Sequence, residues 1–582
     1  MKFLRNVLAT IVGLGIFVGI FFVFMMIMVS AVTSSSEEKQ VLVGKHVLHL
    51  KLDRPIQDQA EENPFGELDI PGLSDNFPLG LNHILTSIES AKDDDKIQAI
   101  YLSFGNFSGG AATLTEIRNA LEQFRDSGKK VFVYAEVMSQ KAYYLASVAD
   151  HISLHPEGGM ELKGLATQIM FYKDFLNKLG VTPQVIRHGK FKSAVEPFML
   201  DKMSEANLKQ TSKLLDTVWG SFAKAIAKSR SISTDELNKL VEDFVIQSPK
   251  NALDSKLVDA LQYKDEFEKN LEDELSDDDV AFVKLDKYYR TLNTNRHKDK
   301  VAVIYAEGQI ISGKSNRNSM GDKTIVKAIR KAKENDHVKA VVLRVNSPGG
   351  SALASDVMWR ELKLLKEEKP LVISMGDLAA SGGYYISCLG DKVFAQANTI
   401  TGSIGVFGLM FEIEELLKDK LELHIDEYKT HKFADLGTMT RPLSVEEKDI
   451  IQNSVKRVYG TFTKNVADGR KLGIDSVDAI GQGRVWAGTD ALAIGLVDEI
   501  GGLDKALAEA AHLASLDNYS VKEYPQQEDE FMDILNSFSG AMMSENSIQS
   551  NQWVQKWMNS INTTLSNEDK IQARMPFELE IY

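Results

Sequence analysis

The sequence predicts two tandem copies of one α/β domain behind an N-terminal transmembrane helix. Three observations support this prediction: a long uncharged run near the N-terminus, three pairs of similar segments at nearly constant spacing, and β-rich runs that alternate with amphipathic helices in each copy. The chain has 582 residues, which is enough for several domains. Its composition, 43% hydrophobic and 26% charged, is typical of a chain that folds for most of its length.

The N-terminal helix is predicted from residues 7–32, which contain no charge. This run exceeds the roughly 20 residues that cross a bilayer as a helix. A cleaved signal peptide normally has an apolar core of only about 7–15 residues, and no clear Ala-x-Ala site follows the run. Because Lys2 and Arg5 precede it, we expect a retained anchor in the inner membrane with a cytoplasmic N-terminus and a periplasmic body.

Charge and cysteine content exclude several classes of protein. The formal charge of −15 argues against a nucleic-acid binder, which normally presents a basic face. The single cysteine, Cys388, excludes an internal disulfide framework and a cysteine-rich metal site. The scattered histidines form no H-E-x-x-H motif, and we expect no metal or cofactor.

Pairs of segments with similar sequences indicate the duplication. IQAIYLSFGNFSGG (97–110) resembles VKAVVLRVNSPGGS (338–351), and a Tyr-Tyr pair and a Leu-Val-Asp motif recur further on. The paired positions are Gly109 and Gly349, Tyr143 and Tyr384, and Ala252 and Ala491, which lie 240, 241 and 239 residues apart. Within each copy, short apolar strands followed by helices indicate βαβ units around a mostly parallel sheet.

These patterns divide the chain into five parts. We expect a cytoplasmic stub and anchor over 1–36, a first copy over 41–263, a charged, solvated helix plus linker over 264–300, a second copy over 301–517 and a tail over 518–582. A Pro/Gly/Asp-rich stretch near residues 63–81 is expected to be a loop. The tail matches neither copy, and its apolar residues offer a surface for a partner copy: Phe531, Met532, Leu535 and Phe538.

Ser381 is the candidate nucleophile. It lies in GDLAASGGYYIS, residues 376–387, where a predicted strand gives way to a helix. The small neighbours suit close packing as well as substrate access, so this stretch alone does not decide whether Ser381 has a structural or a chemical role. Aligned through the tyrosines, the first copy has Gln140 at this position and lacks the hydroxyl. Because the same fold tolerates that replacement, a chemical role for Ser381 is favoured.

A serine nucleophile needs a base, and the copies point to Lys192. No histidine of the second copy lies in a recognisable Ser-His-Asp pattern, whereas Ser-Lys enzymes use a lysine kept neutral by its surroundings. The shared Lys-Phe pair aligns Lys190 with Lys432, which places Lys192 opposite Ala434. One copy therefore keeps the lysine and the other keeps the serine, which predicts a composite site between them. Lys432 remains an alternative base, because a slip of one or two residues in the alignment brings it into play.

Acyl transfer also needs donors for the oxyanion. NSPGGS, residues 346–351, is expected at a strand end, where its turn can direct backbone N–H groups into a cleft. Gly350 and Gly382 are the candidate donors, with Gly349 alongside. In TGSIGVFG, residues 401–408, Ser403 is a candidate for orienting the lysine.

Together, the segments RVNSPGGS, AASGGYYIS, TGSIGVFG, FKSAVEPF and GRVWAGTDALAIGLVDEIGG resemble the signal peptide peptidase A (protease IV) family in its long, double-domain form. The resemblance covers the chain from the anchor to about Ala511. It implies that Ser381 is the nucleophile, Lys192 the general base and Ser403 its assistant. It also implies a crotonase/ClpP-like fold, a bowl-shaped homotetramer, and degradation of cleaved, apolar signal peptides in or near the membrane.

Two other functions are compatible with parts of the sequence. A crotonase-type acyl-CoA enzyme also uses Gly-rich oxyanion turns, but it needs neither a Ser-Lys pair nor an anchor. A catalytically silent scaffold that binds peptides at the membrane has no need to retain Ser381 and Lys192. Peptidase activity distinguishes both from the protease.

Overall fold

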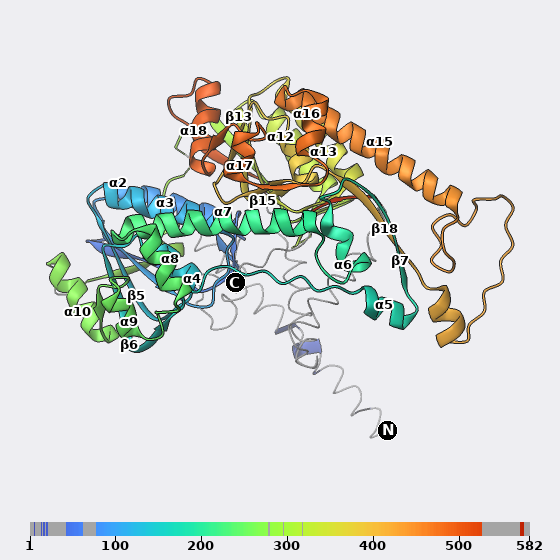
Figure 1. Cartoon of the computed structure of the whole chain (residues 1–582). Helices are drawn as coiled ribbons and strands as arrows, with labels where there is room; N and C mark the ends of the chain where they lie inside the picture. Colours follow the sequence, from blue (N-terminus) through green and yellow to red (C-terminus); the bar gives the residue numbers. More distant parts are fainter. Residues whose placement is uncertain are drawn as a thin grey trace.

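The computed structural model describes residues 5, 13, 15–17, 19–20, 42–61, 77–276, 280–294, 296–316, 318–526 and 571–575. Among these residues, no helix has the length and apolar character needed to span a membrane. The anchor predicted over residues 7–32 falls mostly outside them, as do the apolar tail residues 531–538 and most of the stretch 63–81. The described chain forms two lobes, the first in blue to green and the second in yellow to orange (Figure 1).

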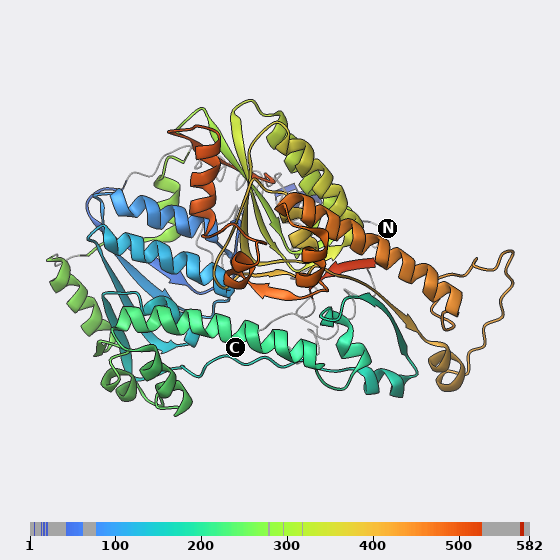
Figure 2. The ribbon, with the colours of Figure 1, turned by 45° about the horizontal axis from the view of Figure 1, so that its top comes forward.

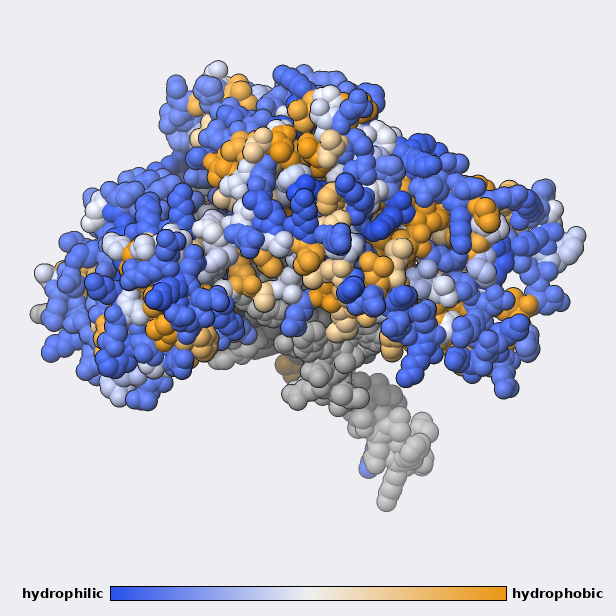
Figure 3. All heavy atoms as spheres, viewed as in Figure 1, coloured by the Kyte–Doolittle hydropathy of each residue, from blue (hydrophilic) through white to orange (hydrophobic). Residues whose placement is uncertain are grey.

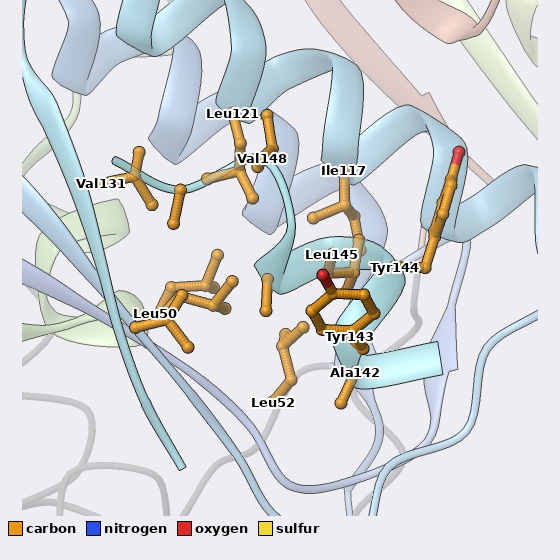
Figure 4. Packing of buried hydrophobic residues seen from close by; sticks show 14 of the residues in the cluster. Leu50, Leu52, Ile117, Leu121, Val131, Ala142, Tyr143, Tyr144, Leu145 and Val148 are labelled. Carbon is orange, nitrogen blue, oxygen red and sulfur yellow. The ribbon is translucent and has the colours of Figure 1, made fainter. Parts of the chain in front are cut away.

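The first lobe is built on a six-stranded sheet with the order β8-β6-β5-β4-β1-β9, in which every neighbouring pair is parallel. Its strands are β1 (His46–Leu52), β4 (Ile97–Phe104), β5 (Lys130–Met138), β6 (His151–Met160), β8 (Ala260–Leu261) and β9 (Phe282–Lys284). Helices α2 (Leu81–Asp93), α3 (Ala111–Asp126) and α4 (Gln140–Ala146) contribute to the core on one face. Figure 4 shows leucines of β1 in this core, together with Ile117 and Leu121 of α3 and the tyrosines of α4.

The second lobe repeats this arrangement with the order β19-β17-β15-β13-β10-β21. At one edge, β17 (Ile400–Gly402) pairs antiparallel with β19 (Val485–Ala487). Its main parallel strands are β10 (Lys300–Glu307), β13 (Val338–Ser347), β15 (Leu371–Ala380) and β16 (Lys392–Ala395). Because side chains alternate across a strand, Val301 and Val303 pack towards α18 (Leu503–Leu513), whereas Ala302 and Ile304 join the core with α12 (Asp322–Glu334) and α13 (Ala352–Lys366). Both faces are covered, as the continuous apolar runs of these strands require.

Equivalent hydrogen bonds recur in the two lobes. The hydroxyl of Tyr143 donates to the carbonyl of Leu257, and that of Tyr384 donates to the carbonyl of Leu496, each at 2.9 Å. All four residues are buried, so each bond satisfies a polar group inside the core. The spacing of the pairs is the one found in the sequence, and the predicted duplication of a mostly parallel α/β domain is confirmed.

The charged segment 264–300 contains a helix, as expected, but the apolar side of this helix packs on the first sheet instead of being solvated. It begins with α10 (Lys264–Leu275), which buries Phe267 and Leu271 on the free face of the first sheet. β9 then pairs with β1 at the sheet edge. In the second lobe, α18 and β21 (Ser520–Tyr524) occupy the corresponding positions. The segment is therefore the end of the first repeat, and its acidic residues lie on the outer side of an amphipathic helix.

A third sheet joins the two lobes, with the order β12-β11-β14-β22-β18-β7. It includes β11 (Gln309–Ile311), β12 (Ser319–Gly321), β14 (Gly349–Ser351) and β22 (Ile571–Arg574). β7 (Thr182–His188) comes from the first copy and pairs antiparallel with β18 (Val406–Glu412) of the second. After β7, helix α7 (Glu205–Arg230) runs back towards the first lobe, as Figures 1 and 2 both show. Residues of the first copy are thereby carried onto the second copy.

An arm, residues 413–444, extends from the second lobe between β18 and α15 (Val445–Arg470) (Figure 1). Its apolar side chains are unusually accessible, since Leu421, Leu423 and Ile425 are each more than half exposed and Tyr428 is 91% exposed. The surrounding surface is mostly hydrophilic and is interrupted by apolar patches (Figure 3).

Buried charges also connect the lobes. Arg344 of β13 is fully buried, and its Nη2 lies 2.8 Å from Asp58 Oδ1 and 2.7 Å from Glu116 Oε1, both in the first copy. Asp377 of β15 accepts hydrogen bonds from the backbone N–H and the hydroxyl of Thr113 at the start of α3. This carboxylate thus caps a helix of the other copy and satisfies an amide that has no partner within the helix.

Glu307 adds a further carboxylate to this contact, and its Oε2 accepts a hydrogen bond from the Asp58 N–H at 3.1 Å. Burial, together with the negative charge of Asp58, raises the pKa of Glu307 to about 8, against the opposing effect of Arg344. Asp377 lies near enough to raise it further. The folded protein therefore binds a proton here that the unfolded chain releases near its ordinary pKa of 4.5.

We expect Glu307→Gln to stabilise the protein increasingly as the pH rises. The folded wild type holds its proton more tightly than the unfolded chain, so its stability falls between pH 4.5 and about 8, at up to about 1.4 kcal/mol per pH unit. The glutamine stays neutral and escapes this loss, and the difference levels off above about pH 8. Unfolding midpoints of the two proteins between pH 5 and 9 measure the effect.

The control is Glu361→Gln, because Arg330 lowers the pKa of Glu361 and this carboxylate remains ionised across that range. Its effect should be the same at pH 5 and pH 9. Parallel pH curves for wild type and Glu307→Gln would show that Glu307 ionises as an ordinary carboxylate.

Candidate active site

Ser381 lies at the junction between β15 and α14 (Gly382–Ser387). Its backbone has φ 56° and ψ −113°, a conformation that residues with a side chain rarely adopt. The Ser381 N–H donates to the carbonyl of Gly402 at 2.8 Å, which fixes this turn against β17 (Ile400–Gly402). From this strained turn the hydroxyl reaches the side chain of Lys192.

Lys192 reaches the same place from the first copy. The β7–β18 ladder pairs His188 with Val406, so that the residues just after β7 lie beside those just before β18. Gln210 of α7 then holds the loop, because its side-chain amide donates to the carbonyl of Phe191 and to the hydroxyl of Ser193. Lys192 is thereby fixed between two anchored neighbours next to Ser403.

The three predicted side chains meet in this structure within one chain. Lys192 Nζ lies 2.8 Å from Ser381 Oγ and 3.1 Å from Ser403 Oγ, and it donates to the Ser403 carbonyl at 3.2 Å. All three residues are 0% exposed. Burial lowers the pKa of Lys192 well below its ordinary value of 10.5, and no carboxylate contributes to the shift. Burial therefore favours the neutral amine, which is the form that can accept a proton.

Two glycines that sequence reasoning missed form the walls around Lys192. A Cβ on Gly483 would lie 2.6 Å from Lys192 Cβ and 2.7 Å from its backbone, and a Cβ on Gly405 would lie 3.2 Å from Lys192 Cδ. Gly483 also has φ +80°, a conformation that favours glycine. Gly405 lies in TGSIGVFG and Gly483 begins GRVWAGTDALAIGLVDEIGG. Neither motif indicates contact with Lys192, because that residue is more than 200 positions away in the sequence.

We expect Gly483→Ala to lower kcat by about 100-fold, because the methyl group displaces Lys192 from Ser381. Gly495→Ala is the matched control: Gly495 has a nearly identical φ of +81°, but a Cβ there would meet only Leu472, at 3.7 Å. Backbone strain is thus similar in the two variants, and the clash with Lys192 occurs in only one. Rates of peptide hydrolysis and unfolding midpoints of both proteins separate the effect of backbone strain from the effect of the clash with Lys192. Equal losses of activity in the two variants would show that the clash with Lys192 is not the cause.

The predicted oxyanion residues gather beside Ser381, with one correction. Gly349 and Gly350 form β14 (Gly349–Ser351) with φ +91° and +157°, and the Gly382 amide lies 2.7 Å from where a Gly349 Cβ would be. The N–H of Gly349, however, donates to Ser347 Oγ at 3.1 Å. Gly349 therefore provides space, and Gly350 and Gly382 remain the candidate donors.

The alternative base is not brought to this site. Lys432 lies in the arm with 65% of its side chain exposed, and its ammonium pairs with Glu446. His424 and His431 are also exposed on the arm. The geometry therefore favours Lys192, which lies beside Ser381, over Lys432 as the base.

Comparisons with known proteins agree with this arrangement. A family model described as peptidase family S49 matches residues 123–277 and again residues 363–517, and a Clp protease model matches residues 292–401. The chain is 39% identical over 477 residues to Protease 4 of Salmonella typhi, covering 79% of this chain and 76% of that protein. It is 31% identical over 544 residues to the chloroplastic serine protease SPPA of Arabidopsis thaliana, covering 91% and 77%.

A third relative is the putative signal peptide peptidase SppA of Enterococcus faecium, which is 34% identical over 239 residues, or 40% of this chain and 69% of that protein. The two S49 matches fall on the two copies identified from internal spacing and repeated hydrogen bonds. The chain therefore belongs to peptidase family S49 and is a serine protease in which the ClpP-like S49 domain occurs twice.

Proposed function

We propose that this protein is a membrane-anchored endopeptidase that degrades cleaved signal peptides with a Ser381–Lys192 dyad. The observation that supports the proposal most strongly is the 2.8 Å separation of Lys192 Nζ and Ser381 Oγ in a fully buried setting. A serine hydroxyl is a weak nucleophile until a neighbouring base removes its proton. A buried, uncharged amine at hydrogen-bond distance is such a base.

The reaction follows from these positions. Lys192 takes the proton as Ser381 Oγ attacks the scissile carbonyl, and the resulting oxyanion accepts hydrogen bonds from the amides of Gly350 and Gly382. The proton then passes to the leaving amine, and an acyl ester remains on Ser381. Lys192 next activates a water molecule, which hydrolyses the ester. Throughout, Ser403 holds the amine in place through its hydroxyl and carbonyl.

The substrate and the setting are part of the proposal. The uncharged run at residues 7–32 suits an inner-membrane anchor with a periplasmic body, and remnant signal peptides are apolar and remain in the bilayer. The printed name of the Enterococcus faecium relative points to the same substrate class. The exposed apolar residues of the arm suit contact with further copies in a homotetramer.

The test is hydrolysis by the full chain, purified in detergent, of a synthetic signal-peptide-like sequence. A charged peptide of equal length serves as the control substrate. We expect internal cleavage of the apolar peptide and slower cleavage of the charged one, followed by mass spectrometry. Binding of the peptide without cleavage would support a silent scaffold, and thioester hydrolysis of an acyl-CoA without peptide cleavage would support a crotonase-type enzyme.

A further inference from the structure

Arg484 is a partly buried charge that the mechanism above does not use. It directly follows Gly483, one of the walls around Lys192, and its Nε is buried without a hydrogen-bond partner among the residues that the structure describes. The guanidinium lies between two aromatic rings, with Cζ 5.2 Å from the ring centre of Phe191 and 4.0 Å from that of Trp486. A guanidinium is attracted to the faces of both rings, so the three side chains form one stack.

The first ring connects this stack to the base. Phe191 directly precedes Lys192, and its backbone N–H donates to the carbonyl of Gln482 at 2.9 Å. The backbone bond and the stacked side chain therefore hold Phe191 at two points against residues 482–484. Because Lys192 is the next residue, any shift of Phe191 also moves the amine relative to Ser381.

The backbone of Arg484 holds the assisting serine. Its carbonyl accepts the N–H of Ser403 at 2.7 Å, and the N–H of the preceding Gly483 donates to the carbonyl of Ile404, also at 2.7 Å. Ser403 has φ +50°, which is uncommon for a residue with a side chain and persists only where the surroundings impose it. Arg484 thus contacts the lysine segment through its side chain and the Ser403 segment through its backbone.

The second ring reaches the backbone that holds the nucleophile. Trp486 Cδ1 would lie only 2.8 Å from a Cβ on Gly402, so the indole can pack this closely because residue 402 is a glycine. The carbonyl of Gly402 is the group that accepts the N–H of Ser381 at 2.8 Å. The indole N–H donates to the carbonyl of Ile480 at 3.0 Å, which fixes the orientation of the ring.

We propose that Arg484 is a positioning residue, which acts through its two stacked rings and its own carbonyl to hold the three site residues in register. The inference rests on the Ser381–Lys192 mechanism proposed above. An ion pair would also hold an arginine, but it would place a carboxylate near Lys192, and a negative charge raises the pKa of a lysine. Asp490 partly opposes the lowering of the Arg484 pKa by burial, yet the pKa of Lys192 is lowered by burial without a contribution from any carboxylate.

The first experiment measures kcat, KM and the pH profile of kcat/KM for wild type, Arg484→Met and Arg484→Lys on the apolar peptide. Methionine has neither the charge nor the planar surface of the guanidinium, so we expect kcat to fall about 10-fold or more while KM changes little. A loosened Lys192 becomes more solvated, and the rise of kcat/KM should therefore move to higher pH by about one unit or more. Arg484→Lys keeps a cation between the rings and should restore part of both properties.

Lys363→Met is the matched control. The Lys363 ammonium lies 5.3 Å from the ring centre of Trp359, which is the same kind of interaction in the same lobe, on an exposed position of α13. This variant should keep the kcat and the pH profile of wild type. An active wild type together with a folded Arg484→Met whose pH profile is unchanged overturns the inference and leaves the proposed function intact. A wild type that does not cleave the peptide refutes the proposed function, and the positioning role with it.

The second experiment tests the stack from the side of Phe191 and does not require Arg484→Met to fold. A small fluorophosphonate labels the nucleophile without a peptide: Ser381 Oγ bonds to phosphorus, fluoride leaves, and Lys192 takes the hydroxyl proton. We expect Phe191→Leu to be labelled more slowly than wild type, with the rise of the labelling rate at higher pH. Adding Arg484→Lys should cause little further loss, because both changes act on one stack. Labelling of Phe191→Leu at the wild-type rate, or losses that multiply in the double variant, would contradict positioning through the stack.

Discussion

Replacing Ser381 by alanine is expected to lower kcat for peptide hydrolysis by about 10⁴-fold or more while the fold is retained. The hydroxyl is the only group at this position that can form the acyl ester, and Lys192 has no other hydroxyl at 2.8 Å to deprotonate. A methyl group fits where the hydroxyl was, and among the residues that the structure describes, Lys192 supplies the one side-chain hydrogen bond that Ser381 receives. Steady-state kinetics and the unfolding midpoint together measure the effect.

Ser387→Ala is the matched control for this variant. Ser387 is also fully buried, belongs to the same helix α14, and donates its hydroxyl to the Gly383 carbonyl at 2.7 Å. It makes no contact with Lys192, so its loss should affect stability more than chemistry. Similar kcat values for Ser381→Ala and wild type would rule out Ser381 as the nucleophile.

Replacing Lys192 by methionine is expected to reduce kcat to a level close to that of Ser381→Ala. Methionine fills most of the same volume but cannot accept a proton. Lys192→Arg should be equally inactive, because a guanidinium stays protonated at every accessible pH. Lys432→Ala is the control, since that lysine is 65% exposed on the arm and should be dispensable. An inactive Lys432→Ala together with an active Lys192→Met would reverse the assignment of the base.

The pH profile tests the same residue without mutation. A protonated Lys192 cannot take the proton of Ser381, so kcat/KM should be low in acid and rise with pH to a plateau. Because burial lowers the pKa of Lys192 well below 10.5, the rise should come well below the pH at which an exposed lysine ionises. A rise centred near the ordinary lysine pKa would show that the amine is solvated during turnover.

Much of the site could be predicted because the two copies differ where chemistry demands it. Ser381 and Lys192 stand out only when each is compared with its counterpart, Gln140 and Ala434. Ser403 came from a weaker form of the same comparison, and the structure places its hydroxyl 3.1 Å from the amine. The Gly-Gly turn was identified from its motif, but the motif did not reveal that the N–H of Gly349 is already used by Ser347.

Other features depend on contacts that sequence spacing does not encode. A helix was expected within 264–300, but the acidic composition masked its apolar side, where Phe267 and Leu271 pack α10 on the first sheet. The place of β22 in the third sheet depends on pairing with strands more than 160 residues earlier, and the tail has no repeat to compare. The bonds from Arg344 and Asp377 to the first copy likewise became apparent only when the two lobes were seen in contact.

The delivery of Lys192 by one copy to Ser381 of the other changes how the active site assembles. If the two halves were separate molecules, the number of working sites would fall on dilution, because each site would need an encounter. Their fusion makes assembly unimolecular, with an effective concentration set by the connecting chain rather than by expression level. If the proposed dyad is the catalytic one, each half supplies a different part of it, so deletion of either half is expected to abolish activity at this site.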